Sequence, residues 1–289
     1  MPLLPGVVFP SSPPSPEALD AGLRLLPPHR IFKPEPGSWP FLAGDDDGRT
    51  GSVCAALRDP EVGILVAARG GHGALRLDRD RVLATLRKHP KPLVGFSDVT
   101  ALHFLWQVAG VPSISGPNVT QLPLLPPDHL DRFLRLFEGR LPLLDVGLTL
   151  HGDAPEAVIE GPLAGGNLTV AASAAGTPWS TPFAGRIVLL EEVREAPYRL
   201  DRLLWQLFAA TDLARAAALV FGEFTECPAF ELELLLATCR RFAPGLPLAS
   251  GFPAGHGPRN FAFTCGAVAR LDLRAGRLTQ PESRFPGPP

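Results

Sequence analysis

The chain has 289 residues and a mass of 30.8 kDa, and its 45% hydrophobic and 19% charged residues are typical of a folded globular protein with one large or two ordinary domains. A formal net charge of −2 and a pI near 6.4 exclude a strongly basic surface for nucleic acid or anionic lipid, which favours a small-molecule or peptide substrate. The four cysteines lack a paired CxxC spacing, so we predict neither a zinc site nor a disulfide framework and expect small buried side chains.

We expect the beginning of the chain to carry no targeting signal. Its first 16 residues include six prolines and lack a basic start followed by an apolar core, unlike a signal peptide. No uninterrupted apolar run is long enough to span a membrane. We therefore predict a cytoplasmic protein.

Apolar runs and helical periodicity alternate through the first half of the chain. The predicted strands cover residues 3–9, 30–33, 63–68 and 92–96. The predicted helices cover residues 16–26, 52–57, 99–106 and 128–137. Alternation of this kind predicts a parallel sheet with helices on both faces, in which ligands gather at the carboxyl ends of the strands.

Two of these strands end in turns suited to chemistry. The strand at 63–68 is followed by the glycine-rich turn at 69–73, which can present amides to an anion but lacks the complete pattern of a phosphate loop. The strand at 92–96 is followed by Ser97, where the unpaired amides of the next helix would stabilise negative charge. Ser97 is therefore either a helix cap or a nucleophile with an oxyanion site beside it.

After residue 137 the regular alternation gives way to short strand-like or irregular segments. We therefore predict an N-terminal α/β domain over 1–137, a linker over 138–160 and a C-terminal β/α domain over 161–289. The second half is predicted to hold strands at 185–190 and 216–221, helices at 198–208 and 230–242, and a hairpin over 261–273 turned at a glycine.

Three polar positions could be site residues or ordinary solvated groups. Glu191 ends an apolar strand, and His256 lies between two glycines in a loop. The aspartates at 45–47 could suggest a metal, but a solvated loop and charge at a helix N-terminus explain them more simply. From the residues alone these alternatives stay open.

Eight short motifs, taken together and in order, resemble the LD-carboxypeptidase family of serine peptidases, which also contains the microcin C immunity peptidases. They cover most of the chain and lie at residues 69–73, 95–103, 115–117, 165–168, 176–179, 190–198, 222–224 and 255–256. The resemblance implies an N-terminal Rossmann-like parallel-sheet domain and a C-terminal mixed β/α swivelling domain, with the active site between them.

The resemblance also implies a Ser-His-Glu triad without a metal or a cofactor. Ser97 matches the nucleophile, His256 the general base, and Glu191 the carboxylate that orients the histidine. The backbone amides of Gly71 and Asp98 match the oxyanion hole, which agrees with a glycine-rich turn and a helix N-terminus at one sheet edge. Glu191, the first acid after its strand, fits the motif better than the acid that follows it.

The resemblance implies a cytoplasmic homodimer that releases terminal D-alanine from an L,D-linked murein tetrapeptide in cell-wall recycling. The alternative is a microcin-type immunity peptidase that cleaves a peptidyl- or aminoacyl-nucleotide antibiotic. A non-catalytic binding protein and a dinucleotide-binding protein are the hypotheses from other classes. A nucleotide would need an aromatic platform, whereas we expect Trp106 and Trp179 to be core residues.

Some positions leave specificity open. An arginine is expected to bind the terminal carboxylate of the substrate, and the candidates near the motifs are Arg69, Arg76 and Arg259. His72 stands where the family usually has tyrosine, and Asn118 stands where methionine often follows the Gly-Pro pair.

Overall fold

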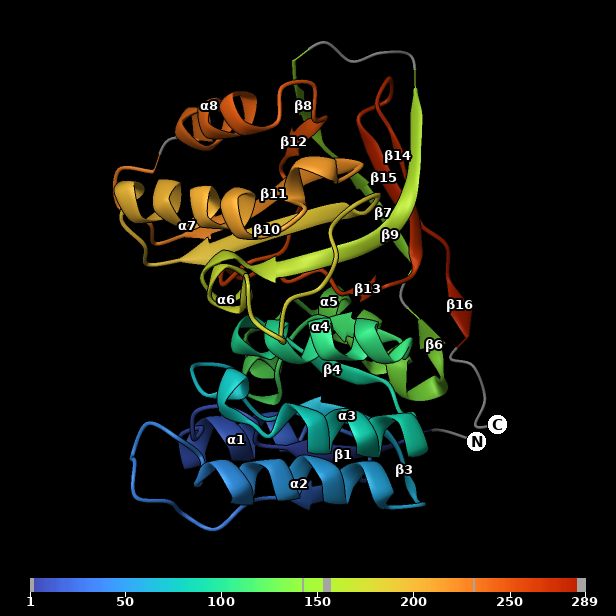
Figure 1. The fold of residues 1–289 in the computed structure, drawn as a ribbon. Helices are drawn as coiled ribbons and strands as arrows, with labels where there is room; N and C mark the ends of the chain where they lie inside the picture. The colour runs from blue at the N-terminus through green and yellow to red at the C-terminus, as the bar shows by residue number, and fades with distance from the viewer. Residues whose placement is uncertain (1–2, 142, 153–156, 231, 285–289) are drawn as a thin grey trace.

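The computed structural model describes residues 3–141, 143–152, 157–230 and 232–284. Its described strands form two large mixed sheets and one small two-stranded sheet, and helices cover the large sheets, as Figure 1 shows. This arrangement confirms the predicted α/β class with two sheets.

The first sheet has the strand order β13-β5-β4-β3-β1-β2, and all neighbours are parallel except β13 and β5. Its strands are β1 (Leu4–Val8), β2 (Arg30–Phe32), β3 (Val62–Ala67), β4 (Leu93–Gly95), β5 (Ser113–Ser115) and β13 (Phe263–Cys265). The helices of this half are α1 (Pro16–Leu23), α2 (Asp46–Arg58), α3 (Arg79–Lys88), α4 (Thr100–Ala109) and α5 (Pro127–Leu134).

The second sheet has the order β7-β15-β14-β9-β10-β11-β12-β8, with a parallel centre from β9 to β12. Its strands are β7 (Leu144–Gly147), β8 (Thr149–His151), β9 (Val158–Asn167), β10 (Ile187–Val193), β11 (Ala218–Thr225), β12 (Leu248–Ser250), β14 (Val268–Asp272) and β15 (Arg277–Gln280). Its helices are α6 (Leu168–Ala174), α7 (Pro197–Ala210) and α8 (Leu232–Phe242), and the small sheet joins β6 (Arg140–Leu141) to β16 (Ser283–Arg284).

Both large sheets bury both faces, which explains why their central strands are continuous apolar runs. In β3, Leu65 and Ala67 pack into one core cluster, and the alternating Ile64 and Val66 pack into the cluster on the opposite face. The strands β10 and β11 are divided between two clusters in the same way. The run of apolar residues thus predicts the strand but not which face each side chain covers.

The predicted hairpin over 261–273 is wrong. Its first strand, β13, pairs with β5 in the first sheet, whereas β14 pairs with β9 and β15 in the second sheet. The backbone amide of Gly266 donates to the carbonyl of Leu163 in β9, so the turn is held by a third strand rather than by a partner within the hairpin. The chain therefore crosses from one sheet to the other at this point.

Two predicted helices have different bounds in the structure. The helix predicted at 52–57 begins at Asp46, because the side chain of Asp45 accepts a hydrogen bond of 2.6 Å from the amide of Gly48 and caps it. The helix predicted over 128–137 is α5 followed by a short 3-10 turn at Arg135–Glu138. Residues 138–160, predicted as a linker, hold β6, β7, β8 and the start of β9, and the division into domains stays a prediction.

Helix α4 lies between the two sheets and contacts both halves of the molecule (Figure 1). The amide of Asn167, at the end of β9, donates to the hydroxyl of Thr100 at the start of α4 over 3.0 Å. The side chain of Phe104 in α4 packs in the core cluster of the second sheet. This packing brings the ends of β4, β9 and β10 close together.

Candidate active site

Ser97 follows β4 after one intervening residue, Phe96, and has a left-handed backbone with φ of 65°. This conformation costs a non-glycine residue about 1–2 kcal/mol, so the surrounding structure must impose it. The backbone of Gly70 supplies one constraint, because a Cβ at that position would lie 2.8 Å from the Cβ of Ser97. The hydroxyl is thereby held on a sharp strand-to-helix turn, partly open to solvent.

His256 lies in the loop between β12 and β13, and its ring connects Ser97 to Glu191. Its Nε2 is 3.1 Å from the hydroxyl oxygen of Ser97, and its Nδ1 is 2.9 Å from Oε2 of Glu191. A proton on Nδ1 donates to the carboxylate and leaves Nε2 free to accept the serine proton. The ring also packs against Phe96 at 4.6 Å between centroids, which restricts its orientation.

Glu191 of β10 is 1% exposed, and this burial is the main cause of a pKa raised above the usual glutamate value. The hydrogen bond from His256 acts in the opposite direction, as does a hydrogen bond of 3.2 Å from the side-chain amide of Asn167. A buried carboxylate beside a histidine favours the imidazolium form when the ring takes up a proton.

The neighbouring acid, Glu192, is also buried, but its carboxylate has a different set of hydrogen-bond donors from that of Glu191. Its carboxylate accepts hydrogen bonds from Asn167 at 2.9 Å, from the backbone and hydroxyl of Thr169 at 2.8 and 2.6 Å, and from the amide of Val193 at 2.8 Å. The pairing of β10 with β11 shifts register between Leu190 and Glu192, where the two acids lie. Of the two acids, Glu191 is the one that contacts His256.

The glycine-rich turn lies against the turn that carries Ser97. The carboxylate of Asp98 accepts a hydrogen bond of 2.8 Å from the amide of Ala74, which ties the two turns together. Gly71 has φ of 107°, and a Cβ there would lie 2.5 Å from the hydroxyl of Ser12. Only glycine fits this position without rearrangement, and the two turns predicted to supply the oxyanion amides are adjacent in space.

Arg49 was not identified from the sequence, yet its side chain is fully buried beside the glycine-rich turn. Its guanidinium donates to the carbonyls of Gly73 at 2.8 Å, Gly44 at 3.2 Å and Pro10, and pairs with Asp46 at 2.5 Å. One side chain therefore holds together three loops at the carboxyl edge of the first sheet. No local pattern distinguishes this arginine from the exposed ones.

Asn118 was noted only as a departure from the family pattern. Its Oδ1 accepts a hydrogen bond of 3.1 Å from the amide of Phe96, the residue before Ser97, and its own backbone amide donates to the side-chain oxygen of Gln121 over 3.0 Å. Asn118 thus helps to fix the backbone that precedes Ser97. His72, the other departure, is exposed.

The three candidate arginines all have partners in the protein. Arg69 donates to the carbonyl of Pro13 at 2.7 Å, Arg76 pairs with Asp46 at 2.8 Å, and Arg259 pairs with Glu223 at 3.1 Å. The hydrogen bond from Arg76 is the main cause of a lowered pKa at Asp46. The aspartates at 45–47 thus serve a helix cap and ion pairs, and within the described ranges no group of three or more His, Cys, Asp or Glu side chains could hold a metal ion.

The tryptophan and cysteine side chains singled out in the sequence differ in how deeply they are buried. Trp106 is fully buried and donates from its indole to the carbonyl of Lys91 at 2.8 Å, which confirms it as a core residue. Trp179 is only partly buried and packs against the core. Burial raises the pKa of the Cys239 and Cys265 thiols to about 12. All four cysteines are free, and Cys227 alone among them is only half-buried.

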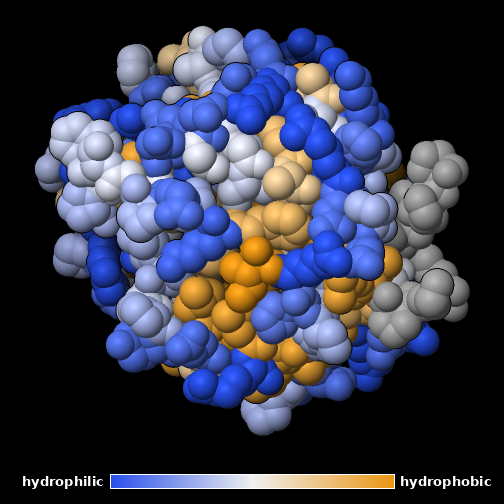
Figure 2. All heavy atoms as spheres, turned by 90° about the horizontal axis from the view of Figure 1, so that it is seen from below, coloured by the Kyte–Doolittle hydropathy of each residue, from blue (hydrophilic) through white to orange (hydrophobic). Residues whose placement is uncertain are grey.

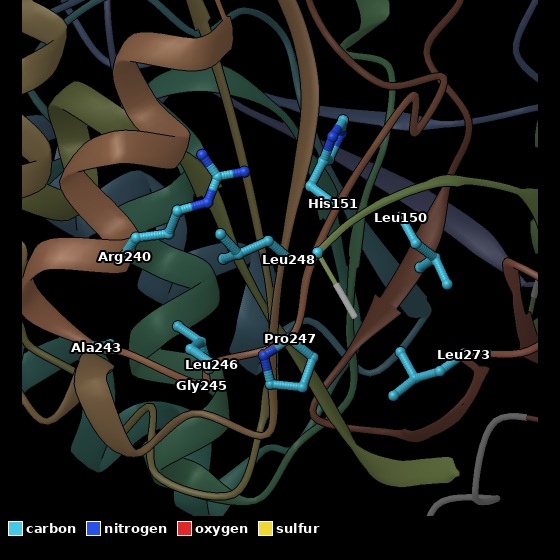
Figure 3. Close-up of a pocket in the computed structure, with 10 residues that line it drawn as sticks. Leu150, His151, Arg240, Ala243, Gly245, Leu246, Pro247, Leu248 and Leu273 are labelled. Atoms are coloured by element: carbon cyan, nitrogen blue, oxygen red, sulfur yellow. The ribbon is translucent and has the colours of Figure 1, made fainter. Parts of the chain in front are cut away.

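A cavity of about 260 Å³ lies elsewhere, beside α8 and the β12–β8 edge of the second sheet (Figure 3). His151 lines this cavity and belongs to a second serine–histidine pair, because its Nε2 is 2.7 Å from the hydroxyl of Ser250. Burial and the nearby Arg240 lower the pKa of His151. No carboxylate is hydrogen-bonded to this histidine among the described residues, so the pair lacks the third member found at Ser97.

Comparison with known proteins identifies the family of the chain. The model of the LD-carboxypeptidase N-terminal domain matches residues 6–116, and that of the LD-carboxypeptidase C-terminal domain matches residues 160–271. The murein tetrapeptide carboxypeptidase of Pseudomonas aeruginosa is 32% identical over 92% of each chain. The chain therefore belongs to the LD-carboxypeptidase family, a family of peptidases.

Solved structures show the same fold. The muramoyltetrapeptide carboxypeptidase of Oxalobacter formigenes superimposes with a TM-score of 0.81 at 29% identity, covering 95% of this chain and 97% of that one. MccF in complex with glutamyl sulfamoyl guanosine gives a TM-score of 0.82 at 17% identity over 98% and 97% of the two chains, a likeness of fold alone. None of the described helices is long and apolar enough to cross a membrane.

Proposed function

We propose that this protein is a serine carboxypeptidase that hydrolyses the L,D-peptide bond of a murein tetrapeptide and releases terminal D-alanine. The single observation that carries the proposal is the chain of hydrogen bonds from Ser97 through His256 to the buried Glu191. The relative from Pseudomonas aeruginosa is named for this substrate, and it matches almost the whole chain.

In the proposed reaction, the hydroxyl oxygen of Ser97 attacks the carbonyl carbon of the cleaved bond while Nε2 of His256 accepts the hydroxyl proton. The amides of Gly71 and Asp98 donate to the oxyanion that forms. Glu191 holds the proton on Nδ1 of the histidine and stabilises the imidazolium.

His256 then donates its proton to the leaving amine, which departs as the free D-amino acid. Water attacks the acyl-enzyme in the second half of the reaction, with His256 again accepting a proton, and Ser97 is restored. A carboxylate at the end of the substrate needs a cationic partner, and Arg69, Arg76 and Arg259 stay the candidates for it.

The direct test is incubation of the protein with murein tetrapeptide, followed by mass spectrometry. We expect loss of one alanine with the natural protein and none with Ser97→Ala. If neither protein acts on the tetrapeptide but the natural protein cleaves an aminoacyl sulfamoyl nucleoside, the microcin-type alternative replaces the proposal.

We further propose that the protein acts in the cytoplasm, in the recycling of cell-wall peptides, as a homodimer. Figure 2 shows an apolar area bordered by hydrophilic residues on the lower face of the molecule, a surface of the kind that a dimer buries. Sedimentation equilibrium at micromolar concentration is expected to give twice the chain mass, and a single-chain mass would contradict the dimer.

A further inference from the structure

Three aromatic rings form a continuous strip on the surface near Ser97. The rings of Trp39 and Phe41 are 5.8 Å apart, and those of Phe41 and His72 are 6.0 Å apart. Trp39 is 56% exposed and Phe41 is 48% exposed, and His72 is exposed as well. We call Trp39, Phe41 and His72 the aromatic strip.

The loop that carries the strip is anchored in the fold. The amide of Leu42 donates to the carbonyl of Trp39 over 3.1 Å, which closes a turn with Pro40 in the position where proline is favoured. Leu42 is buried beside Gly73, and the amide of Ala43 donates to the carbonyl of Ser11 over 3.0 Å. Two large aromatic side chains are thus kept in water by a fixed turn, which marks a surface for a ligand.

The strip begins beside the glycine-rich turn that packs against Ser97. His72 directly follows Gly71, and its amide donates to the hydroxyl of Ser12 over 3.0 Å, which fixes its place beside the glycine-rich turn. Gly70, on the other side of Gly71, packs against Ser97. The strip therefore begins two residues along the chain from the glycine that packs against Ser97, within the span of a few substrate residues.

The length of the strip indicates which part of the substrate it meets, and this step rests on the proposed function. When a carboxypeptidase removes one residue from a tetrapeptide, the leaving group is a single residue and three residues remain on the acyl side. Three extended residues span about 10 Å, close to the two ring-to-ring steps from His72 to Trp39. The group attached before those three residues would lie at the far end of the strip.

We propose that the aromatic strip is a subsite for the sugar of a muramoyl peptide, an N-acetylated pyranose carried before the tetrapeptide. One face of a pyranose presents C–H groups, so it can stack on Trp39 and Phe41 while its hydroxyl groups stay in water. A nucleobase would also stack on such rings, but the likeness to MccF is one of fold alone, whereas a relative at 32% identity is named for a murein peptide.

The test measures binding rather than turnover, in the Ser97→Ala protein, by titration calorimetry with murein tetrapeptide and with its muramoyl form. We expect the muramoyl form to bind about tenfold more tightly. Adding Trp39→Ala is expected to remove this difference while leaving the affinity for the free tetrapeptide unchanged. The matched control is Trp205→Ala, which removes another half-exposed tryptophan, on α7, far along the chain from the strip. It is expected to keep the difference in affinity between the two peptides.

Equal affinity for the two peptides, or a difference that survives Trp39→Ala, would overturn the subsite. Tighter binding of an aminoacyl sulfamoyl nucleoside that is lost in Trp39→Ala would also overturn it, in favour of a nucleobase site. The proposed function can fail independently of the subsite. If the strip binds the sugar but the natural protein releases no D-alanine, the subsite is kept and the proposed hydrolysis is refuted.

Discussion

Two hydrogen-bonded serine–histidine pairs occur in the part of the chain that the structure describes, and their surroundings differ. Ser97 and His256 are 3.1 Å apart, and Ser250 and His151 are 2.7 Å apart. The first serine has a left-handed backbone beside a glycine-rich turn and its histidine contacts a buried carboxylate, whereas the second serine ends a regular strand. A short contact between serine and histidine is therefore not sufficient to indicate a nucleophile.

Removing each serine hydroxyl gives the largest expected contrast. Ser97→Ala is expected to lower kcat on murein tetrapeptide by about 10⁴-fold or more, because it removes the proposed nucleophile. Ser250→Ala is expected to leave kcat within about twofold, since none of the described carboxylates is hydrogen-bonded to the histidine of that pair. Steady-state release of D-alanine measures both, and equal losses would end the distinction between the pairs.

The carboxylate behind the first histidine gives the next contrast. Glu191→Gln is expected to lower kcat by about 10³- to 10⁴-fold, because Nδ1 loses the carboxylate that favours its proton and stabilises the imidazolium. An unchanged kcat would assign Glu191 a purely structural role.

The same substitution also tests the electrostatics of burial. The folded-state pKa of Glu191 lies above its unfolded value, so ionisation of this group destabilises the fold at neutral pH, and the effect disappears as the pH falls through the raised pKa. Glu191→Gln is therefore expected to have a higher Tm than the natural protein at pH 7 and a smaller advantage in acid. Thermal unfolding followed by circular dichroism measures this difference, and a larger advantage in acid would contradict the sign.

Substitution of Arg49 tests whether anchoring of the glycine-rich turn contributes to catalysis at Ser97. Arg49→Met is expected to lower kcat by about 10²-fold with little change in KM, because the turn that carries an oxyanion donor loses its anchor at the Gly73 carbonyl. Arg49→Lys is expected to restore part of the loss. Arg240→Met, beside the second pair, is the control and is expected to leave kcat unchanged; a fall in Tm without a change in kcat for Arg49→Met would make this arginine structural alone.

The smallest effect concerns the backbone of the two serines. Ser97→Gly is expected to raise the free energy of unfolding by about 0.5–1 kcal/mol, since glycine adopts a left-handed φ without strain. Ser250→Gly, within a strand, is expected to lower it by about 0.5–1 kcal/mol. Urea denaturation of both variants measures the two signs, and the same sign for both would show that Ser97 is not strained.

The sequence predicted the elements better than their partners. Buried parallel strands such as β3 and β10 are apolar runs whatever their neighbours are, so the runs alone identify them. The pairing of β13 with β5 depends on where the chain passes after His256, and no local pattern specifies that path. For this reason the hairpin was predicted within one sheet.

The residues of the site divide in the same way, into those that sequence motifs identify and those whose roles depend on contacts between distant segments. Ser97, Glu191 and His256 each occur in motifs that suggest their roles, and the structure brings the three side chains together. Arg49 and Asn118 act through carbonyls and amides that are distant in the sequence, so their types and spacing carry no signal. The left-handed backbone of Ser97 likewise lies at a close contact with Gly70 from another turn, which no local pattern specifies.

The most direct test of the proposed nucleophile is labelling with a small fluorophosphonate, which reacts with activated serine hydroxyls. Peptide mapping by mass spectrometry is expected to find one adduct per chain, on Ser97, and none on Ser250. His256→Ala is expected to lose the adduct because the serine is no longer activated. An adduct on Ser250, or an unlabelled Ser97 in a protein whose release of D-alanine the reagent has abolished, would contradict the account.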